Sequence, residues 1–153
     1  MTAKPRVFVG SSVEGLGIAN AIQRNLEHNY YVNVWNQGIF KPSSTTLEDL
    51  IKALGTFDFA IFVFKPEDVV KMRNQTEMSI RDNVIFEMGL FIGRLGKERT
   101  FYIIPREEKF HLPTDLIGFN PATYDPGHPE IAAAIGGACT SIMEQMNSLS
   151  TLK

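Results

Sequence analysis

The sequence predicts a single α/β domain in which an open sheet of five parallel strands lies between two layers of helices. Three observations support this prediction. Short apolar runs of strand type alternate with segments of helical periodicity. The central runs "FDFAIFVF" and "FYIIP" are continuously apolar, as is typical of strands covered on both faces. The 153 residues, 44% of them hydrophobic, suffice for one core and are too few for a second domain of similar size.

Five strands are expected along the chain. They are Val7–Val9, Tyr31–Trp35, Phe57–Phe64, Phe101–Ile104 and, with a weaker signal, Ala122–Tyr124. Right-handed connections through helices would make the sheet parallel. The expected product is a flavodoxin-like, three-layer fold whose ligand crevice lies at the carboxyl ends of the strands, near the point where the strand order reverses.

Three of the four expected helices are indicated by apolar residues at helical spacing. The first helix has an apolar face made by Leu16, Ala19, Ile22 and Leu26. The second has one made by Leu47, Leu50, Ile51 and Leu54. The last is marked by Ile131, Ile135, Ala138, Ile142, Met146 and Leu149.

The remaining helix should span about Ile80–Leu95. Ser79 begins a capping pattern that places Asp82 in the first turn, and Gly96 fits the end of the helix.

Composition excludes several classes of function. The net charge of -2, without a basic stripe, argues against duplex nucleic acid as a partner. The lone Cys139 excludes an internal disulfide framework, and His28, His111 and His128 show no ligand spacing, so we expect no metal site.

No apolar run approaches the roughly 20 residues that cross a bilayer, and the N-terminus leads into a strand rather than a signal sequence. We therefore expect a cytoplasmic protein whose partners are small molecules or proteins.

One acidic residue stands out in the stretch "RDNVIFEMGLF", residues 81–91. Glu87 lies among large apolar residues, where a carboxylate is costly to desolvate. Asn83, Glu87 and Arg94 share one stripe of the expected helix, because 11 residues are close to three turns. Two interpretations remain open: Glu87 pairs with Arg94 or points outward, or it lines the ligand crevice.

Two further features lie at the same edge of the expected sheet. Gly10, Ser11 and Ser12 follow the first strand at the start of a helix, where free N–H groups favour an anion such as phosphate. The dinucleotide fingerprint and the Walker lysine are absent, so an ordinary connection fits as well. Trp35 ends the second strand, where its ring can stack on a base or a pyridinium, or serve a core or an interface.

Several segments together resemble the Toll/interleukin-receptor (TIR) fold, and within it prokaryotic TIR-like domains regarded as nucleotide-binding. The segments are "VFVGSSVEG", "VNVWNQGIFKPSSTTLEDL", "FDFAIFVFKPEDV", "RDNVIFEMGLFIGRLGKERTFYIIP" and "LPTDLIGFNPATYD". Such domains occur in bacterial anti-phage systems, including as the effector half of TIR-STING proteins. The resemblance implies that residues 1–153 form one TIR-like domain that is excised from, or acts with, a separate sensor domain such as STING.

The resemblance also implies cleavage of NAD+ between nicotinamide and ribose, with Glu87 as the catalytic residue, NAD+ as the substrate and no cofactor. The chain departs from the family in two places. Asn83 stands where an aromatic residue often precedes the glutamate, and Ser11-Ser12 replaces a basic pair. Trp35 matches a family aromatic and is expected to stack on nicotinamide.

The expected substrate contacts are Gly10, Ser11, Ser12, Trp35, Asp82 and Asn83. The loop Gly38–Thr46 corresponds to the segment through which TIR domains pack on one another, with Phe40, Lys41 and Pro42 as the assembly residues. In this family a neighbouring subunit typically completes the active site, so activity should depend on self-assembly. Two alternatives stay open: a scaffold without enzymatic activity that signals by homotypic contact, and a nucleotide sensor without turnover.

Overall fold

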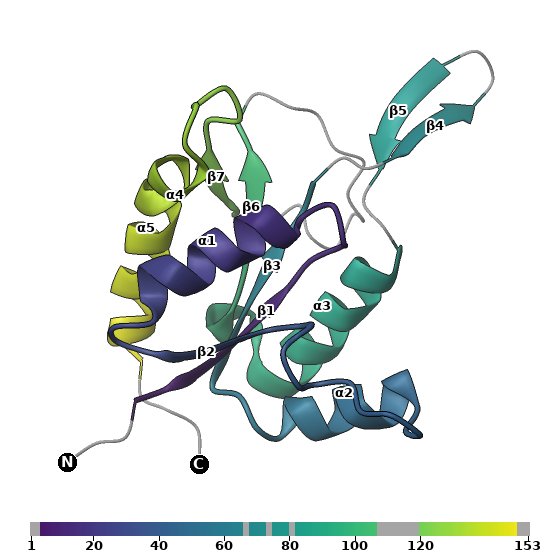
Figure 1. The fold of residues 1–153 in the computed structure, drawn as a ribbon, viewed down its shortest axis with the longest axis vertical. Coiled ribbons are helices and arrows are strands. Elements are labelled where there is room, and N and C mark those ends of the chain that lie inside the picture. Colours follow the sequence, from purple (N-terminus) through teal and green to yellow (C-terminus); the bar gives the residue numbers. More distant parts are fainter. Residues whose placement is uncertain (1–3, 66–67, 73–74, 80–81, 107–119, 150–153) are drawn as a thin grey trace.

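The computed structural model describes residues 4–65, 68–72, 75–79, 82–106 and 120–149. It confirms the five-stranded parallel sheet, drawn in Figure 1. The strands are β1 (Arg6–Gly10), β2 (Tyr31–Val34), β3 (Phe59–Val63), β6 (Thr100–Pro105) and β7 (Ala122–Tyr124). Their order, β2-β1-β3-β6-β7, is the flavodoxin-like order expected from the sequence.

The strand register aligns the carboxyl ends where the site is expected. Val9 pairs with Val34 of β2 on one side and with Ile61 of β3 on the other. β1 therefore lies at the point where the strand order reverses, and the loop that follows Gly10 opens at the edge where ligands of such sheets bind.

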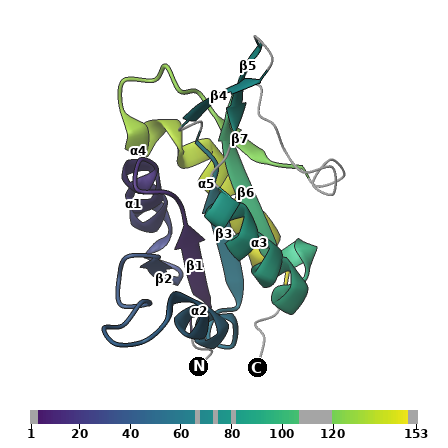
Figure 2. The same ribbon diagram turned by 90° about the vertical axis from the view of Figure 1, so that its right-hand side faces the viewer.

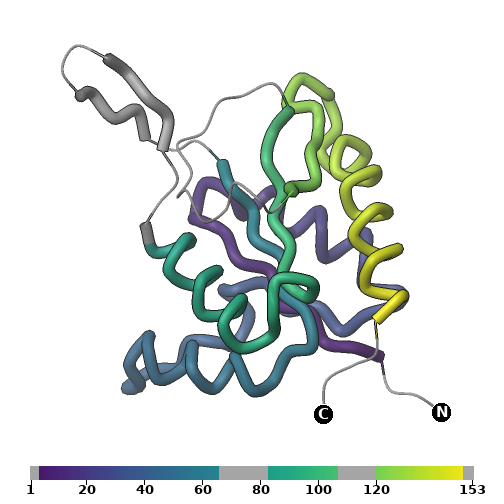
Figure 3. The backbone as a smooth tube through the Cα atoms, turned by 180° about the vertical axis from the view of Figure 1, so that it is seen from behind, coloured from purple at the N-terminus to yellow at the C-terminus, as the bar shows by residue number. Residues whose placement is uncertain are grey.

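Helices cover both faces of the sheet, as Figure 2 shows from the side. One layer contains α1 (Leu16–Leu26), α4 (Ile131–Ala134) and α5 (Gly136–Asn147). The other contains α2 (Thr46–Leu54), α3 (Asp82–Leu95) and the 3-10 helix η1 (Lys97–Arg99). Figure 3 shows α3 running beside α2 when the molecule is seen from behind.

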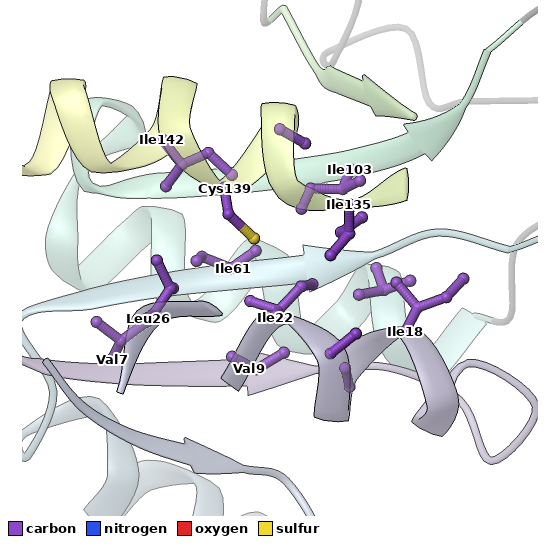
Figure 4. Packing of buried hydrophobic residues seen from close by; sticks show 14 of the residues in the cluster. Val7, Val9, Ile18, Ile22, Leu26, Ile61, Ile103, Ile135, Cys139 and Ile142 are labelled. Atoms are coloured by element: carbon purple, nitrogen blue, oxygen red, sulfur yellow. The ribbon is translucent and has the colours of Figure 1, made fainter. Parts of the chain in front are cut away.

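Each face of the sheet has its own buried core, because side chains alternate along the strands. On the α1 side, Ile22, Ile61 and Cys139 pack together (Figure 4). On the α3 side the core is aromatic: the rings of Phe8 and Phe91 stack with centroids 4.8 Å apart. This stack fixes α3 against β1.

Two predicted helical faces differ from the structure. In α2, Leu47 and Ile51 are 51% and 56% exposed, and the buried residues are Asp49, Leu50 and Ala53. Leu50 and Leu54 pack on the core as predicted, so the prediction is wrong only at Leu47 and Ile51. Part of the inward side is taken instead by Asp49, whose carboxylate accepts a hydrogen bond from Lys41 N. The predicted last helix is divided at Ile135, directly before two glycines, which weaken helix continuity.

The segment before α3 also differs from the expectation. It contains an antiparallel hairpin, β4 (Asp68–Met72) and β5 (Gln75–Ser79), which the sequence analysis did not predict. Ser79 pairs with Asp68 as a strand residue, so its expected role as a helix cap is wrong. The helix begins at Asp82 rather than near Ile80, and Ile80 lies outside the described residues. Within the described ranges, no helix is both long and apolar enough to span a bilayer.

Candidate active site

Helix α3 carries Glu87 on the flank of its buried face. The buried residues recur at helical spacing and are Val84, Met88, Phe91 and Leu95. Glu87 lies beside this row and is half-buried, whereas Asn83 and Arg94 on the same flank are exposed. The packing of Phe91 on Phe8 thus fixes the rotation of α3 about its axis, and with it the position of Glu87 at the border of the buried face.

Burial raises the pKa of the Glu87 carboxyl from 4.5 to about 7. Desolvation is its one identified cause, because low polarity disfavours the charged form. Within the part of the chain that the structure describes, no hydrogen bond or ion pair engages this carboxylate, and Arg94 does not pair with it. The simplest structural interpretation, an ion pair with Arg94, is therefore not observed.

The loop after β1 differs in detail from its prediction. Helix α1 begins at Leu16, so Ser11 and Ser12 lie in the loop that precedes it rather than at its start. Both serines are buried, at 6% and 7% exposure. The Ser12 hydroxyl accepts from Gly15 N at 3.2 Å, and the Ser11 hydroxyl donates to Ser12 O at 2.8 Å. Their roles as substrate contacts stay predictions.

Gly10 has a packing reason for being glycine. A Cβ at this position would lie 2.6 Å from Cε1 of Phe62 on the neighbouring strand, closer than side chains can approach. The residue therefore allows β1 and β3 to pack at the carboxyl edge.

Trp35 is held at this edge by two hydrogen bonds. It follows β2 by one residue, and its backbone N–H donates to Val9 O at 2.9 Å. Its indole Nε1 donates to Ser11 Oγ at 2.8 Å. The structure thus brings into direct contact two predicted site residues that the sequence placed only at the same edge of the sheet. The ring is half-buried and contacts both cores.

The loop Gly38–Thr46 is anchored by a residue that the sequence analysis overlooked. Asp49 of α2 is only 4% exposed, and its Oδ2 accepts from Lys41 N at 2.8 Å. Lys41 and Pro42 are exposed and Phe40 is half-buried. The sequence signal that could have indicated this anchor was an acidic residue in the first turn of α2, directly after a long polar loop.

Asp82, another predicted substrate contact, is the first residue of α3, and its side chain is outside the described part of the structure.

Glu87 lines none of three well-formed cavities whose walls are described residues. The cavity at the carboxyl edge, about 210 Å³, lies beside α1 and α4 and includes Glu14, Lys65 and His128. That Glu87 opens into the ligand crevice therefore stays a prediction. No group of three His, Cys, Asp or Glu residues within the described ranges could hold a metal ion.

Comparison with known proteins gives a consistent family match. Residues 6–126 match the family model described as "CAP12/Pycsar effector protein, TIR domain". The Pycsar effector protein PaPycTIR of Pseudomonas aeruginosa is 44% identical over 146 residues, covering 94% of this chain and 47% of that protein. BcPycTIR of Burkholderia cepacia is 40% identical over 152 residues, covering 97% and 50%. The chain thus spans about half the length of these relatives.

A solved structure agrees on architecture. The flavodoxin-like domain from Synechococcus superposes with a TM-score of 0.54 at 12% sequence identity, covering 94% of this chain and 99% of that one. At this identity the likeness establishes the fold alone.

Proposed function

The chain belongs to the family of CAP12/Pycsar effector TIR domains, and from that premise we propose that it cleaves NAD+ at the bond between nicotinamide and ribose. Glu87 is the observation that supports this proposal most strongly. It is a half-buried carboxylate with a pKa raised to about 7 and no partner among the described residues. Such a group costs stability, and strongly shifted carboxyls concentrate at functional sites.

The reaction needs a negative charge beside the ribose, and one carboxylate can supply it. The pyridinium nitrogen of NAD+ takes the electron pair of the glycosidic bond, so nicotinamide leaves neutral while positive charge develops on the ribose. A carboxylate about 4 Å from that charge contributes on the order of 4 kcal/mol at an effective dielectric near 20. This corresponds to roughly a thousandfold in rate. Water then adds to the anomeric carbon and loses a proton, which yields ADP-ribose.

The raised pKa of Glu87 is compatible with this role. An empty site disfavours the charged form of the carboxyl, but the cationic nicotinamide of bound NAD+ would favour it. Substrate binding would therefore lower the pKa and generate the carboxylate where the positive charge develops. Trp35, held by Ser11, would present its ring to the pyridinium.

Self-association is part of the same proposal. Leu47 and Ile51 form an exposed apolar pair on α2, directly after the loop Gly38–Thr46. A second copy of the chain that packs there would bury this pair and bring a neighbouring loop to the active site. Contiguous exposed apolar residues commonly mark such contacts.

We also propose that the domain is the effector part of a longer anti-phage protein. Its relatives are named Pycsar effector proteins and are about twice the length of this chain. The remaining half would carry a sensor domain, and the sequence resemblance suggests STING as one candidate.

The decisive experiment incubates the concentrated protein with NAD+, with and without a crowding agent that promotes assembly, and follows nicotinamide by chromatography. We expect release that rises more steeply than the protein concentration, because neighbouring copies complete the site. Absence of nicotinamide at every concentration and in both solutions would contradict the proposal.

A second candidate function is a scaffold that acts by homotypic contact alone. The exposed pair Leu47 and Ile51 favours it, because such a surface serves assembly whether or not chemistry follows. A scaffold has no need of Glu87, so the two functions differ in their response to its removal.

A further inference from the structure

We propose that a cavity between β1, β2 and α2 binds a phosphate group carried by a small molecule. The cavity measures about 220 Å³, and Arg6, Lys41 and Lys52 contribute its cationic groups. It lies at the amino end of β1, whereas Ser11 and Trp35 lie beyond the carboxyl end. Four residues of strand, about 13 Å, separate the two places. The cavity is therefore distinct from the candidate active site.

Arg6 is held in position before any ligand arrives. Its Nη2 donates to Asn33 Oδ1 at 3.2 Å, and its Cζ lies 4.9 Å from the ring centroid of Phe57. Its backbone N–H donates to Asp58 Oδ2 at 2.9 Å. Hydrogen bonds to described residues use one of the five guanidinium N–H donors, so the others can donate to the oxygens of an anion. A pre-positioned guanidinium loses little freedom on binding.

The lining carries more positive than negative charge. Three cationic side chains face one acid, Asp49, which leaves a formal excess of two. Asp49 is already engaged: the backbone N–H of Lys41 is the main cause that lowers the pKa of its carboxyl, assisted by Ser44, Lys52 and the Lys41 charge. Asp49 therefore stays ionised and orients the loop rather than filling the cavity.

Size and charge select the ligand class. The 220 Å³ of this cavity falls below the roughly 300 Å³ at which sites for whole small molecules begin. It suits one group of a ligand rather than a complete dinucleotide. A phosphate monoester carries about −1.5 to −2 charges at pH 7 and presents three acceptor oxygens. Arg6, Lys41 and Lys52 come from three separate elements, so they can meet three such oxygens.

A bound phosphate would join these elements. Lys41 belongs to the loop Gly38–Thr46, Arg6 to β1 and Lys52 to α2. The ligand would thereby hold the loop against β1 and α2. This consequence for assembly rests on the proposed function, whereas the binding site itself does not.

Calorimetric titration tests the site directly, with pyrophosphate and inorganic phosphate as probes at constant ionic strength. Parallel arms with adenosine monophosphate and adenosine distinguish a free phosphate from one attached to a nucleoside. We expect saturable binding of the phosphate-bearing probes, weakened by salt, and no binding of adenosine at this site. Arg6→Gln and Lys52→Gln should each weaken pyrophosphate binding about fivefold or more, as loss of one charge contact at about 4 Å implies.

Matched controls separate a site from general attraction. Arg24→Gln and Lys97→Gln remove a guanidinium and an amine that do not line the cavity, and should leave the affinity unchanged. If Arg6→Gln fails to fold, the pyrophosphate affinities of Lys52→Gln and Lys41→Gln test the site in its place. Equal weakening by control and cavity variants, or no saturable binding, would overturn the proposal. Lys52 also lies in the last turn of α2, where its charge can stabilise the helix. A Lys52→Gln variant that is less stable but binds pyrophosphate with the parent affinity would likewise overturn the proposal.

Discussion

The indole Nε1 of Trp35 donates a hydrogen bond to the Ser11 hydroxyl at 2.8 Å. This contact joins the end of β2 to the loop after β1, and Val9 and Val34, which pair in the sheet, bring the two residues together. Ser11 in turn donates to Ser12 O. The hydroxyl therefore orients the ring that we propose to meet nicotinamide.

The Ser11–Trp35 contact should be measurable as a coupling energy. Ser11→Ala and Trp35→Phe each remove one partner, and the double variant should lose less stability than the sum of the two. We expect a coupling of about 0.5–1.5 kcal/mol, typical of one net hydrogen bond. Urea unfolding of the four proteins measures it. Strictly additive losses would show that the contact contributes nothing.

Replacing the ring itself should affect substrate binding. Trp35→Ala removes the stacking surface, so we expect KM for NAD+ to rise about tenfold with a smaller change in kcat. Steady-state kinetics of nicotinamide release provide the measurement. A KM equal to that of the parent would remove Trp35 from the site.

The pKa of Glu87 predicts how stability depends on pH. The folded value, about 7, lies above the ordinary 4.5, so the folded state holds this proton more tightly than the unfolded state. Glu87 therefore makes the protein progressively less stable as pH rises from about 4.5 to 7. Glu87→Gln removes that loss, and we expect it to be about 1–3 kcal/mol more stable than the parent at pH 8, after allowance for solvent screening. The measurement is urea unfolding at pH 5 and pH 8, and a stability difference that does not change with pH would count against the burial of this acid.

Asp49 should control the order of the loop Gly38–Thr46. Asp49→Ala removes the acceptor for Lys41 N, so we expect faster hydrogen exchange and faster proteolysis within the loop. Glu144→Ala, at an exposed position of α5 and outside the loop, is the control. Unchanged protection of the loop in the Asp49 variant would show that other contacts hold it.

The exposed pair on α2 should determine self-association. Leu47→Glu combined with Ile51→Glu places charge on the proposed contact, so we expect dissociation in analytical ultracentrifugation without loss of folding stability. Ile131→Glu, which changes a residue 49% exposed on the opposite helical layer, serves as the control. If both variants associate like the parent, the contact between copies lies elsewhere.

The sequence was most informative where burial is complete. The five residues of β3, Phe59–Val63, are all buried, and continuous apolar character is what predicted the strand. The order of the strands followed from the regular alternation of strands and helices. The local pattern of apolar residues was sufficient to predict these elements, because each element shows its own pattern without reference to the others.

The remaining features depend on contacts that periodicity does not encode. Ser11 and Trp35 are 24 residues apart, and only the register of β1 against β2 makes them neighbours. Asp49 is buried where its carboxylate accepts a hydrogen bond from Lys41 N of the loop, so it occupies part of the inward side of α2 beside Leu50. The position of Glu87 among apolar residues and the direction of its pKa shift were predictable, whereas only the structure shows that Arg94 does not pair with it.

The catalytic role of Glu87 is tested by the rate of nicotinamide release from NAD+ by Glu87→Gln, compared with the parent and with Glu27→Gln at the exposed end of α1. All three proteins are assayed at equal concentration and in the same assembly state. We expect Glu87→Gln to lose about a hundredfold to a thousandfold in rate and Glu27→Gln to retain the parent rate. A Glu87→Gln protein that releases nicotinamide as fast as the parent would contradict the catalytic role of Glu87.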